Sequence, residues 1–348
     1  MPARAGAVVL FGSGETSGVG RDALRWLVAS GRELQRITVL ETPAGFEPNA
    51  DAVARRWTEF FERQDASQGS AVAQLPLRRR AAALGTDDPE AARPLLGADL
   101  VALGAGSPTY AVRHLRDSLA WRYVSAARAH GASLFLASAA AVAAGTLALP
   151  VYEIYKVGED PHWKDGLGVL EPFGLSLAIV PHWDNTDGGD TLDTSHCFIG
   201  AARFAALAMS LPAATVVVGL EEHTALAIDV ETSTASVIGH GGVEVIREGL
   251  LTEHRAGSAF PLSELGPFAL PDRGALVPED LARLIAAERP RTVAAPEIPA
   301  AVAALIAARE RARSRRAWAE ADALRRKIGE LGWTVEDTAA GPSAKRAP

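Results

Sequence analysis

The feature that most constrains the fold is a regular alternation of apolar runs with amphipathic stretches over residues 1–260. Short continuous runs of Val, Ile and Leu, each followed by a helix, are typical of a parallel sheet that is buried on both faces. We therefore predict an α/β domain with a mostly parallel central sheet and helices on both faces. Four strand-and-helix pairs carry this prediction: AVVLF with RDALRWLVAS, RITVLET with ADAVARRWTEFFERQ, DLVALGAG with TYAVRHLRDSLA, and ASLFLAS with AAAVAAGTLAL.

The later apolar runs have a different character. LSLAIVPHW, ATVVVGLEE, TALAIDVETSTASVIG and GVEVIRE follow one another with turn residues such as GHGG between them. This pattern favours antiparallel strands. We expect the sheet to acquire a mixed edge.

Two changes of composition mark the rest of the chain. Residues 261–297 are rich in proline and are predicted to be a linker. Residues 298–348 contain strong helix formers, with ten Lys or Arg against six Asp or Glu, whereas residues 1–297 carry a net charge of −11. We therefore predict an α/β domain over residues 1–260, the linker, and a basic helical hairpin over residues 298–348 that breaks near Ser314–Ala317.

Composition narrows the class of protein. The 348 residues are 48% hydrophobic and 22% charged, as in ordinary globular proteins. A single cysteine, Cys197, excludes an internal disulfide framework and favours a reducing compartment, so we expect a cytoplasmic protein. Residues 131–152 carry no charge but are only weakly apolar, which favours a buried strand and helix over a membrane span. We expect no membrane contact.

Ligands of open α/β sheets bind at the carboxyl ends of the strands, so we expect functional residues in the loops that follow the apolar runs. The first is LFGSGETSGVG, whose glycines could approach an anion with Glu41 as a ribose-binding acid, or could form a plain turn. The second is LGAGSPTY, where Gly104 and Gly106 leave backbone amides unobstructed. The others are LASAAAVAAG, IVPHWDN and VVVGLEEHTALAI.

Ser138 lies in LASAAAVAAG and has two interpretations. It could be a nucleophile on a sharp strand-to-helix turn, which usually has the pattern G-x-S-x-G because small neighbours relieve the strained backbone. It could instead be a small residue that lets a helix pack closely. Leu136 and Ala140 stand where the pattern has glycine. His182 and Glu222, each directly after an apolar run, are the residue types that would accept the serine proton and orient the imidazole.

Taken together, these loops resemble the family of aspartyl dipeptidase and cyanophycinase, which are serine hydrolases. The resemblance implies an α/β fold like that of class I glutamine amidotransferases. The order and approximate spacing of the motifs agree over about residues 5–250. The segments that correspond are Gly12-Ser13-Gly14-Glu15, Gly104-Ala105-Gly106-Ser107, Ser138-Ala139-Ala140-Ala141, Pro181-His182-Trp183, and Gly219 to Ala225. The sequence departs from the family at both elbow glycines and at Ser107, where the family has asparagine.

The resemblance implies a catalytic triad of Ser138, His182 and Glu222. It also implies an oxyanion hole formed by the backbone amides of Gly106 and Ala139. We expect Glu15, Tyr152 and Lys156 to line the substrate site, the last two in the polar and aromatic stretch 151–163. A loop with aromatic anchors is the simpler interpretation of that stretch.

The acidic stretch HWDNTDGGDTLDTSHC could suggest a metal site, but its spacing fits no calcium loop and no zinc motif. We therefore predict neither a metal nor a cofactor. Cys197 could be an alternative nucleophile, but it follows a loop and not a strand, which favours a buried structural thiol.

Residues 307–341 resemble the C-terminal region of cysteinyl-tRNA synthetases. The matching residues are Trp318, Ala321-Asp322, Leu324-Arg325, Leu331-Gly332 and Glu336-Asp337-Thr338. No HIGH-like or KMSKS-like segment is present, so we expect no aminoacylation activity. The arginines of this segment could contact tRNA, or the hairpin could be a solvated element that docks on the acidic domain.

Our first hypothesis is a serine hydrolase that cleaves a small peptide or amide, with an acyl-enzyme intermediate. The alternative is a catalytically inactive α/β module that binds a ligand or a protein and contacts tRNA through its tail. A homo-oligomer is possible under either hypothesis.

Overall fold

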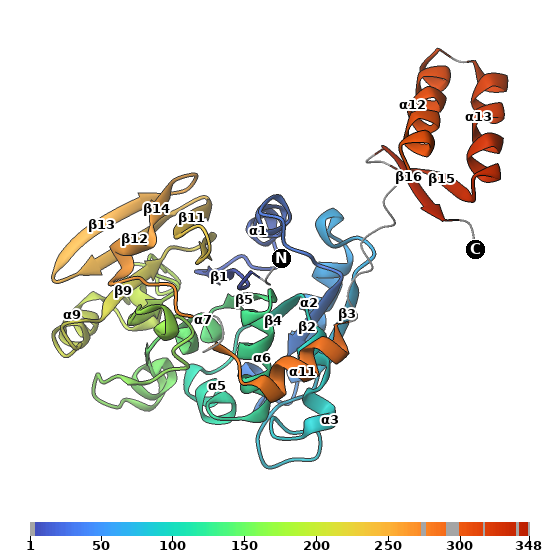
Figure 1. The fold of residues 1–348 in the computed structure, drawn as a ribbon. Helices are drawn as coiled ribbons and strands as arrows, with labels where there is room; N and C mark the ends of the chain where they lie inside the picture. Colours follow the sequence, from blue (N-terminus) through green and yellow to red (C-terminus); the bar gives the residue numbers. More distant parts are fainter. Residues whose placement is uncertain (1–3, 273–275, 290–298, 316, 339–340, 347–348) are drawn as a thin grey trace. The chain divides into compact units, whose positions relative to one another are not determined.

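The computed structural model describes residues 4–272, 276–289, 299–315, 317–338 and 341–346. The chain forms two compact units, Met1–Glu288 and Arg289–Pro348 (Figure 1). Each unit has its own hydrophobic core.

The central sheet of the first unit has eight strands in the order β14-β11-β10-β1-β5-β4-β2-β3. The five strands from β1 to β3 in this order are parallel, and β10, β11 and β14 extend the sheet in antiparallel fashion. This mixed α/β arrangement with a mostly parallel core confirms the predicted fold class and the mixed edge. The strands are β1 (Val8–Phe11), β2 (Arg36–Leu40), β3 (Ala71–Leu75), β4 (Leu100–Leu103), β5 (Ser133–Ala137), β10 (Thr224–Asp229), β11 (Thr234–Gly239) and β14 (Ala259–Pro261).

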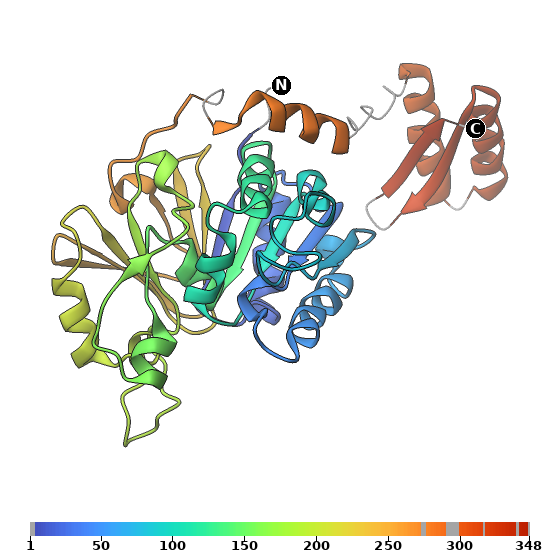
Figure 2. The same cartoon turned by 90° about the horizontal axis from the view of Figure 1, so that it is seen from below.

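Alternate residues of each strand point to opposite faces, and both faces are covered (Figure 2). Val9 and Phe11 pack with helices α1 and α2, whereas Val8 and Leu10 belong to the core that includes α4, α6 and α11. The helices are α1 (Gly18–Ala29), α2 (Ala50–Glu62), α3 (Pro89–Ala92), α4 (Pro94–Gly97), α5 (Pro108–Leu115), α6 (Leu119–Ala129), α7 (Ala139–Ala144), α8 (Ser195–Phe198), α9 (Ala201–Met209) and α11 (Glu279–Glu288). Short 3₁₀ turns are η1 (Thr42–Ala44), η2 (Asp65–Ser67), η4 (Glu171–Phe173) and η5 (Leu262–Leu265).

A second sheet of six strands lies in the same unit, in the order β13-β12-β9-β8-β6-β7. The sequence predicts only one sheet, and it predicts antiparallel strands for LSLAIVPHW and ATVVVGLEE, but β8 and β9 pair in parallel. Their continuous apolar runs are buried on both faces, and such runs do not reveal which sheet a strand joins. The strands are β6 (Leu147–Ala148), β7 (Lys164–Asp165), β8 (Leu177–Val180), β9 (Val216–Leu220), β12 (Gly242–Arg247) and β13 (Leu250–Arg255).

Part of the proline-rich segment belongs to the first unit. Within residues 261–288 lie η5 and α11, and α11 packs on α4 and α6. Leu281 and Ile285 of α11 are buried in the main core. The rest of the predicted linker, residues 290–297, lies outside the described residues.

The second unit contains α12 (Ala300–Ser314) and α13 (Trp318–Glu330), a helical hairpin that breaks where the sequence predicts. It also contains an antiparallel pair, β15 (Trp333–Thr338) and β16 (Gly341–Arg346), which the sequence analysis missed. Trp333 and Val335, two residues apart on β15, are buried in a small core with Val302 and Ile328. Apolar residues at every second position are typical of a strand and could have predicted β15. Among the described residues, no helix is both long and apolar enough to cross a membrane.

Candidate active site

Five strands of the two sheets end near a single cavity. The loops that follow β1, β4, β5, β8 and β9 are those that the sequence analysis selected. Hydrogen bonds link the loop after β5 to the loop after β8, and the latter to the loop after β9. The carboxyl ends of strands therefore meet here, as expected for an open α/β sheet.

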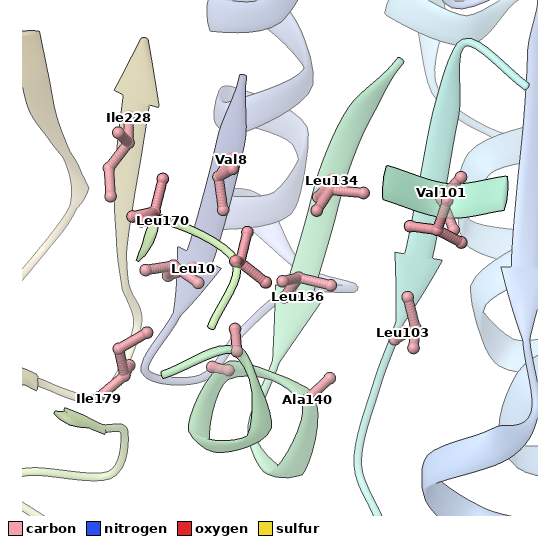
Figure 3. Close-up of a cluster of buried hydrophobic side chains, with 14 of the residues drawn as sticks. Val8, Leu10, Val101, Leu103, Leu134, Leu136, Ala140, Leu170, Ile179 and Ile228 are labelled. Carbon is pink, nitrogen blue, oxygen red and sulfur yellow. The ribbon is translucent and has the colours of Figure 1, made fainter. Parts of the chain in front are cut away.

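Ser138 occupies a sharp turn between β5 and α7. Its backbone has φ 50° and ψ −117°, a conformation that is unusual for a residue with a side chain. Its neighbours along the strand and helix, Leu136 and Ala140, are both buried in the main core (Figure 3). Leu136 lies between Leu10 of β1 and Leu103 of β4 in the parallel register. The turn therefore forms with leucine and alanine at the two positions where the family pattern has glycine.

The side chains of Ser138, His182 and Glu222 form a continuous chain of contacts. His182 Nε2 lies 3.2 Å from Ser138 Oγ, and His182 Nδ1 lies 2.9 Å from Glu222 Oε1. When Nδ1 carries the proton and donates to the carboxylate, Nε2 is free to accept a hydrogen bond from the serine hydroxyl. His182 itself has φ 52°, so two of these three residues have a left-handed backbone.

Three further polar side chains hold Glu222 and its loop, and the sequence analysis missed them. Asn185 Nδ2 donates to Glu222 Oε1 at 3.0 Å, and Asp184 Oδ1 accepts from the Glu222 amide at 2.7 Å. Ser13 Oγ accepts from the amide of His223 at 2.8 Å. Their positions were the available signal. Asp184 and Asn185 lie two and three residues after His182, and Ser13 lies in the first glycine turn.

The charge of Glu222 is stabilised by these contacts. The hydrogen bond from His182 has the largest effect, and the pKa of Glu222 falls to about 2 although burial opposes the shift. The side chains of Asn185 and Ser13 lower this pKa further. Glu222 is therefore ionised at neutral pH and can accept the hydrogen bonds from His182 and Asn185.

A left-handed turn supports the backbone of His182 from the other side. His196, Cys197 and Phe198 have consecutive positive φ values of 54°, 60° and 67°. The amide of Cys197 donates to the carbonyl of His182 at 3.1 Å, and the amide of His196 donates to that of Trp183 at 2.9 Å. Three adjacent residues in this conformation store strain, which concentrates at functional sites.

The cavity beside Ser138 has a volume of about 240 Å³. Its wall includes Gly106, Ala139, Tyr152 and Lys156, four of the residues that the sequence analysis selected. The remaining lining residues are Pro108, Ser138, Val142, Val151, Tyr155, His182, Cys197 and Phe198.

The two expected oxyanion donors occupy special backbone positions. Ala139 is the first residue of α7, where amides have no partner within the helix. Gly106 has φ 143°, and a Cβ atom there would come within 2.0 Å of the Pro43 carbonyl oxygen. Only glycine therefore fits at position 106.

Of the three residues expected to line the substrate site, Tyr152 and Lys156 line the cavity and Glu15 does not. Tyr152 precedes a five-residue π-helical turn, η3 (Glu153–Val157), that carries Lys156, whose ammonium lies 4.6 Å from the centre of the Tyr155 ring. Glu15 is not among the lining residues of the cavity. Burial raises the pKa of Glu15, and the nearby charge of His182 opposes this rise.

Cys197 also lines the cavity, but its thiol is poorly suited to act as a nucleophile. Burial, with a smaller contribution from the charge of Glu222, raises its pKa to about 12. It is therefore protonated at neutral pH, whereas a thiolate is the reactive form.

The acidic residues that the sequence suggested for nucleotide or metal binding form hydrogen bonds within the protein. Glu41 is buried and accepts hydrogen bonds from Gln74 and Arg78, each at 2.5 Å. In the acidic stretch, the carboxylate of Asp193 accepts hydrogen bonds from Ser195 and from the amide of Ala201. Within the described ranges, no group of three or more His, Cys, Asp or Glu side chains could hold a metal ion.

The fold is similar to that of solved peptidases. A peptidase from an acI-B1 Actinobacterium matches with a TM-score of 0.58 and 21% sequence identity, over 75% of this chain and 98% of that chain. A putative peptidase E protein from Listeria monocytogenes EGD-e matches with a TM-score of 0.43 and 14% identity, over 73% and 100% of the two chains. The first of these likenesses shows that the chain has a peptidase-like fold.

The C-terminal segment has a separate likeness. Residues 295–341 match the cysteinyl-tRNA ligase anticodon binding domain. Over 50 residues, the chain is 54% identical to the cysteine–tRNA ligase of Rubrobacter xylanophilus and 48% identical to that of Chlamydia abortus. The matches span 11% and 10% of the lengths of these ligases and 14% of this chain. Both resemblances that the sequence suggested are thus supported.

Proposed function

We propose that this protein is a serine hydrolase that cleaves a small peptide or amide through an acyl-enzyme on Ser138. The observation that carries the proposal is the 3.2 Å contact between His182 Nε2 and Ser138 Oγ at a residue with φ 50°. A serine held on a strained turn within hydrogen-bond distance of an imidazole, which in turn contacts a carboxylate, has the parts of an activated nucleophile.

In the proposed mechanism, Ser138 Oγ attacks the substrate carbonyl while His182 Nε2 takes the hydroxyl proton. Glu222 stabilises the imidazolium, and the amides of Gly106 and Ala139 donate hydrogen bonds to the oxyanion. His182 then gives the proton to the leaving amine. Water, activated by the same imidazole, cleaves the acyl-serine ester and regenerates the enzyme.

Labelling with a fluorophosphonate probe tests this proposal, because the probe reacts with activated serines. We expect the wild-type chain to be labelled and Ser138→Ala to remain unlabelled. Ser125→Ala is a matched control, since Ser125 is exposed on α6, away from the contacts described above. If the wild type is not labelled, the protein is a catalytically inactive module of this fold. If Ser138→Ala is labelled equally, another serine is the reactive one and the proposed triad is wrong.

We propose further that the second unit contacts tRNA. Its match to the anticodon binding domain of cysteinyl-tRNA ligase motivates this proposal. Trp318 is 58% exposed, and Arg325 lies two helical turns further along the same face of α13. An exposed aromatic ring with nearby cations is suited to stack on an unpaired base and to contact phosphates.

A gel-shift assay with tRNA tests the second proposal on the full chain. We expect Trp318→Ala and Arg325→Ala each to weaken tRNA binding, with the arginine variant also lowering its salt dependence. Arg21→Ala, a change of an exposed arginine on α1, is the control. Equal affinity of all the variants would exclude this face of α13.

A further inference from the structure

The size of the cavity limits which part of a substrate can enter it. Its volume of about 240 Å³ is below the roughly 300–1,000 Å³ of pockets that enclose drug-sized ligands. A small acyl group fits, and the remainder of a larger substrate must lie outside. The surface beside the cavity therefore bears on the nature of the leaving group.

A row of three aromatic rings includes two side chains of α5, the helix whose first residue, Pro108, lines the cavity. The centres of the Phe46 and Tyr110 rings are 5.1 Å apart, and those of Tyr110 and His114 are 4.3 Å apart. Tyr110 and His114 belong to α5, the helix that starts at Pro108, and both Gly106 and Pro108 line the cavity. Phe46 is 49% exposed. We refer to Phe46, Tyr110 and His114 as the ring row.

Two exposed arginines flank the ring row. Arg113 lies on α5, and Arg79 lies in the segment after β3. Neither guanidinium has an ion-pair or hydrogen-bond partner within the part of the chain that the structure describes. In contrast, Arg78 and Arg80 are each paired with a carboxylate. Burial raises the pKa of Tyr110, and the charges of Arg79 and Arg113 oppose this rise, so both arginines lie near the ring.

This surface contrasts with the rest of the first unit. Residues 1–297 carry a net charge of −11, yet two exposed arginines, unpaired among the described residues, lie near Tyr110 of α5, the helix that begins at the cavity wall. Phosphates require cations, and unpaired bases stack on aromatic side chains. The unpaired end of an RNA supplies both groups. The likeness of the second unit to an anticodon binding domain points to tRNA as the RNA.

We propose that the substrate is an aminoacyl ester at the 3′ end of a tRNA, with the acyl group in the cavity and the terminal nucleotides on the ring row, Arg79 and Arg113. The inference rests on the proposed hydrolase function and names its substrate class. It combines the small cavity, the cationic and aromatic surface beside it, and the tRNA-related second unit.

The reaction follows the mechanism proposed above, with an alcohol as the leaving group. Ser138 Oγ attacks the aminoacyl carbonyl, the bond from this carbon to the ribose oxygen breaks, and His182 delivers the serine proton to that oxygen. Water then cleaves the acyl-serine ester. The products are a free amino acid and an uncharged tRNA, and no further reactant is required.

The test uses the full chain and a cysteine-specific tRNA charged with radiolabelled cysteine or alanine. The measurement is the rate at which label is released from acid-precipitable tRNA. We expect the wild type to release label and Ser138→Ala to be inactive. The double variant Arg79→Ala/Arg113→Ala should lose about tenfold in kcat/KM on charged tRNA and show a weaker salt dependence. Its rate on p-nitrophenyl acetate should be unchanged.

Arg122→Ala is the matched control, because Arg122 is exposed on α6 and has no partner among the described residues. An enzyme that is labelled by the fluorophosphonate and cleaves the small ester, but leaves both charged tRNAs intact, would overturn the substrate assignment alone. An unlabelled, inactive enzyme would overturn the proposed function as well. If the double variant slows cleavage of a glutamate-rich peptide amide and not of charged tRNA, the surface binds acidic peptides and the proposal fails.

Discussion

The hydroxyl oxygen of Ser13 accepts a hydrogen bond from the backbone amide of His223 at 2.8 Å, although the two residues are 210 positions apart in the chain. Ser13 belongs to the glycine turn after β1, and His223 follows Glu222 in the loop after β9. A side chain of the loop after β1 thereby provides a hydrogen-bond acceptor for a backbone amide of the loop after β9. The turn after β1 thus supports the position of Glu222. From the sequence, the glycines of this turn were also compatible with an anion-binding loop.

Ser13→Ala should therefore weaken the site indirectly. We expect a loss of at most about 1 kcal/mol in the free energy of unfolding, because one hydrogen bond to the exposed loop after β9 is removed. We also expect kcat for a small ester to fall while KM changes little, since the Glu222 loop loses a support. Chemical denaturation and steady-state kinetics measure the two effects. Ser17→Ala is the control, because the Ser17 hydroxyl donates a hydrogen bond to the carbonyl of Gly14 at an exposed turn of the same loop. An unchanged kcat in Ser13→Ala would contradict this role.

Leu136 should contribute to stability and not obstruct the elbow. Leu136 is 1% exposed and packs between two neighbouring strands, so Leu136→Ala should cost about 2–5 kcal/mol in the free energy of unfolding. Leu136→Gly should cost at least as much, without faster fluorophosphonate labelling of Ser138. Urea denaturation and labelling rates check the two statements. If Leu136→Gly speeds labelling strongly and leaves stability intact, leucine distorts the turn.

The low pKa of Glu222 predicts a stability change in acid. The folded-state pKa of about 2 lies below the ordinary value of 4.5, so the ionised carboxylate stabilises the fold above pH 4.5. This contribution should be lost as the pH falls from about 4.5 to 2. Glu222→Gln should lack that part of the pH dependence in denaturation curves. Glu62→Gln, at an exposed position on α2, should retain it. Identical curves for Glu222→Gln and wild type would argue against the shift.

Cys197 should be unreactive in the native protein. Burial raises its pKa to about 12, so the thiolate is scarce at neutral pH and iodoacetamide should modify it only after unfolding in urea. Mass spectrometry of the alkylated chain distinguishes the native from the unfolded reaction. Cys197→Ser should keep fluorophosphonate labelling at Ser138. Rapid alkylation of the native chain, or loss of labelling in Cys197→Ser, would point to the thiol as the nucleophile.

Much of the fold was predictable from local patterns. Continuous apolar runs such as Val8–Phe11 and Ser133–Ala137, each followed by an amphipathic helix, define a mostly parallel sheet because only such a sheet buries both faces of a strand. The break between α12 and α13 near Ser314 was predictable in the same way. The candidate residues Ser138, His182 and Glu222 followed from a related argument. Each lies directly after an apolar run or close to its end, where the carboxyl ends of strands meet.

Other features depend on the tertiary structure. The pairing of β8 with β9 in a second sheet could not be predicted, because an apolar strand buried on both faces carries no information about its neighbours. The contacts of Ser13 with His223 and of Asn185 with Glu222 join residues that are far apart in the chain. The left-handed turn at Cys197 has no glycine to reveal it.

For this protein, the sequence by itself determined the α/β class, the basic tail and the short set of residues that could carry chemistry. Hydrophobic periodicity and composition are local properties, and they suffice for these conclusions. Only the tertiary structure decided that a sharp turn forms at Ser138 with Leu136 and Ala140 near it, because both side chains find room in the core between neighbouring strands and helices. The distances between Ser138, His182 and Glu222 likewise depend on how two sheets pack, which no local pattern encodes.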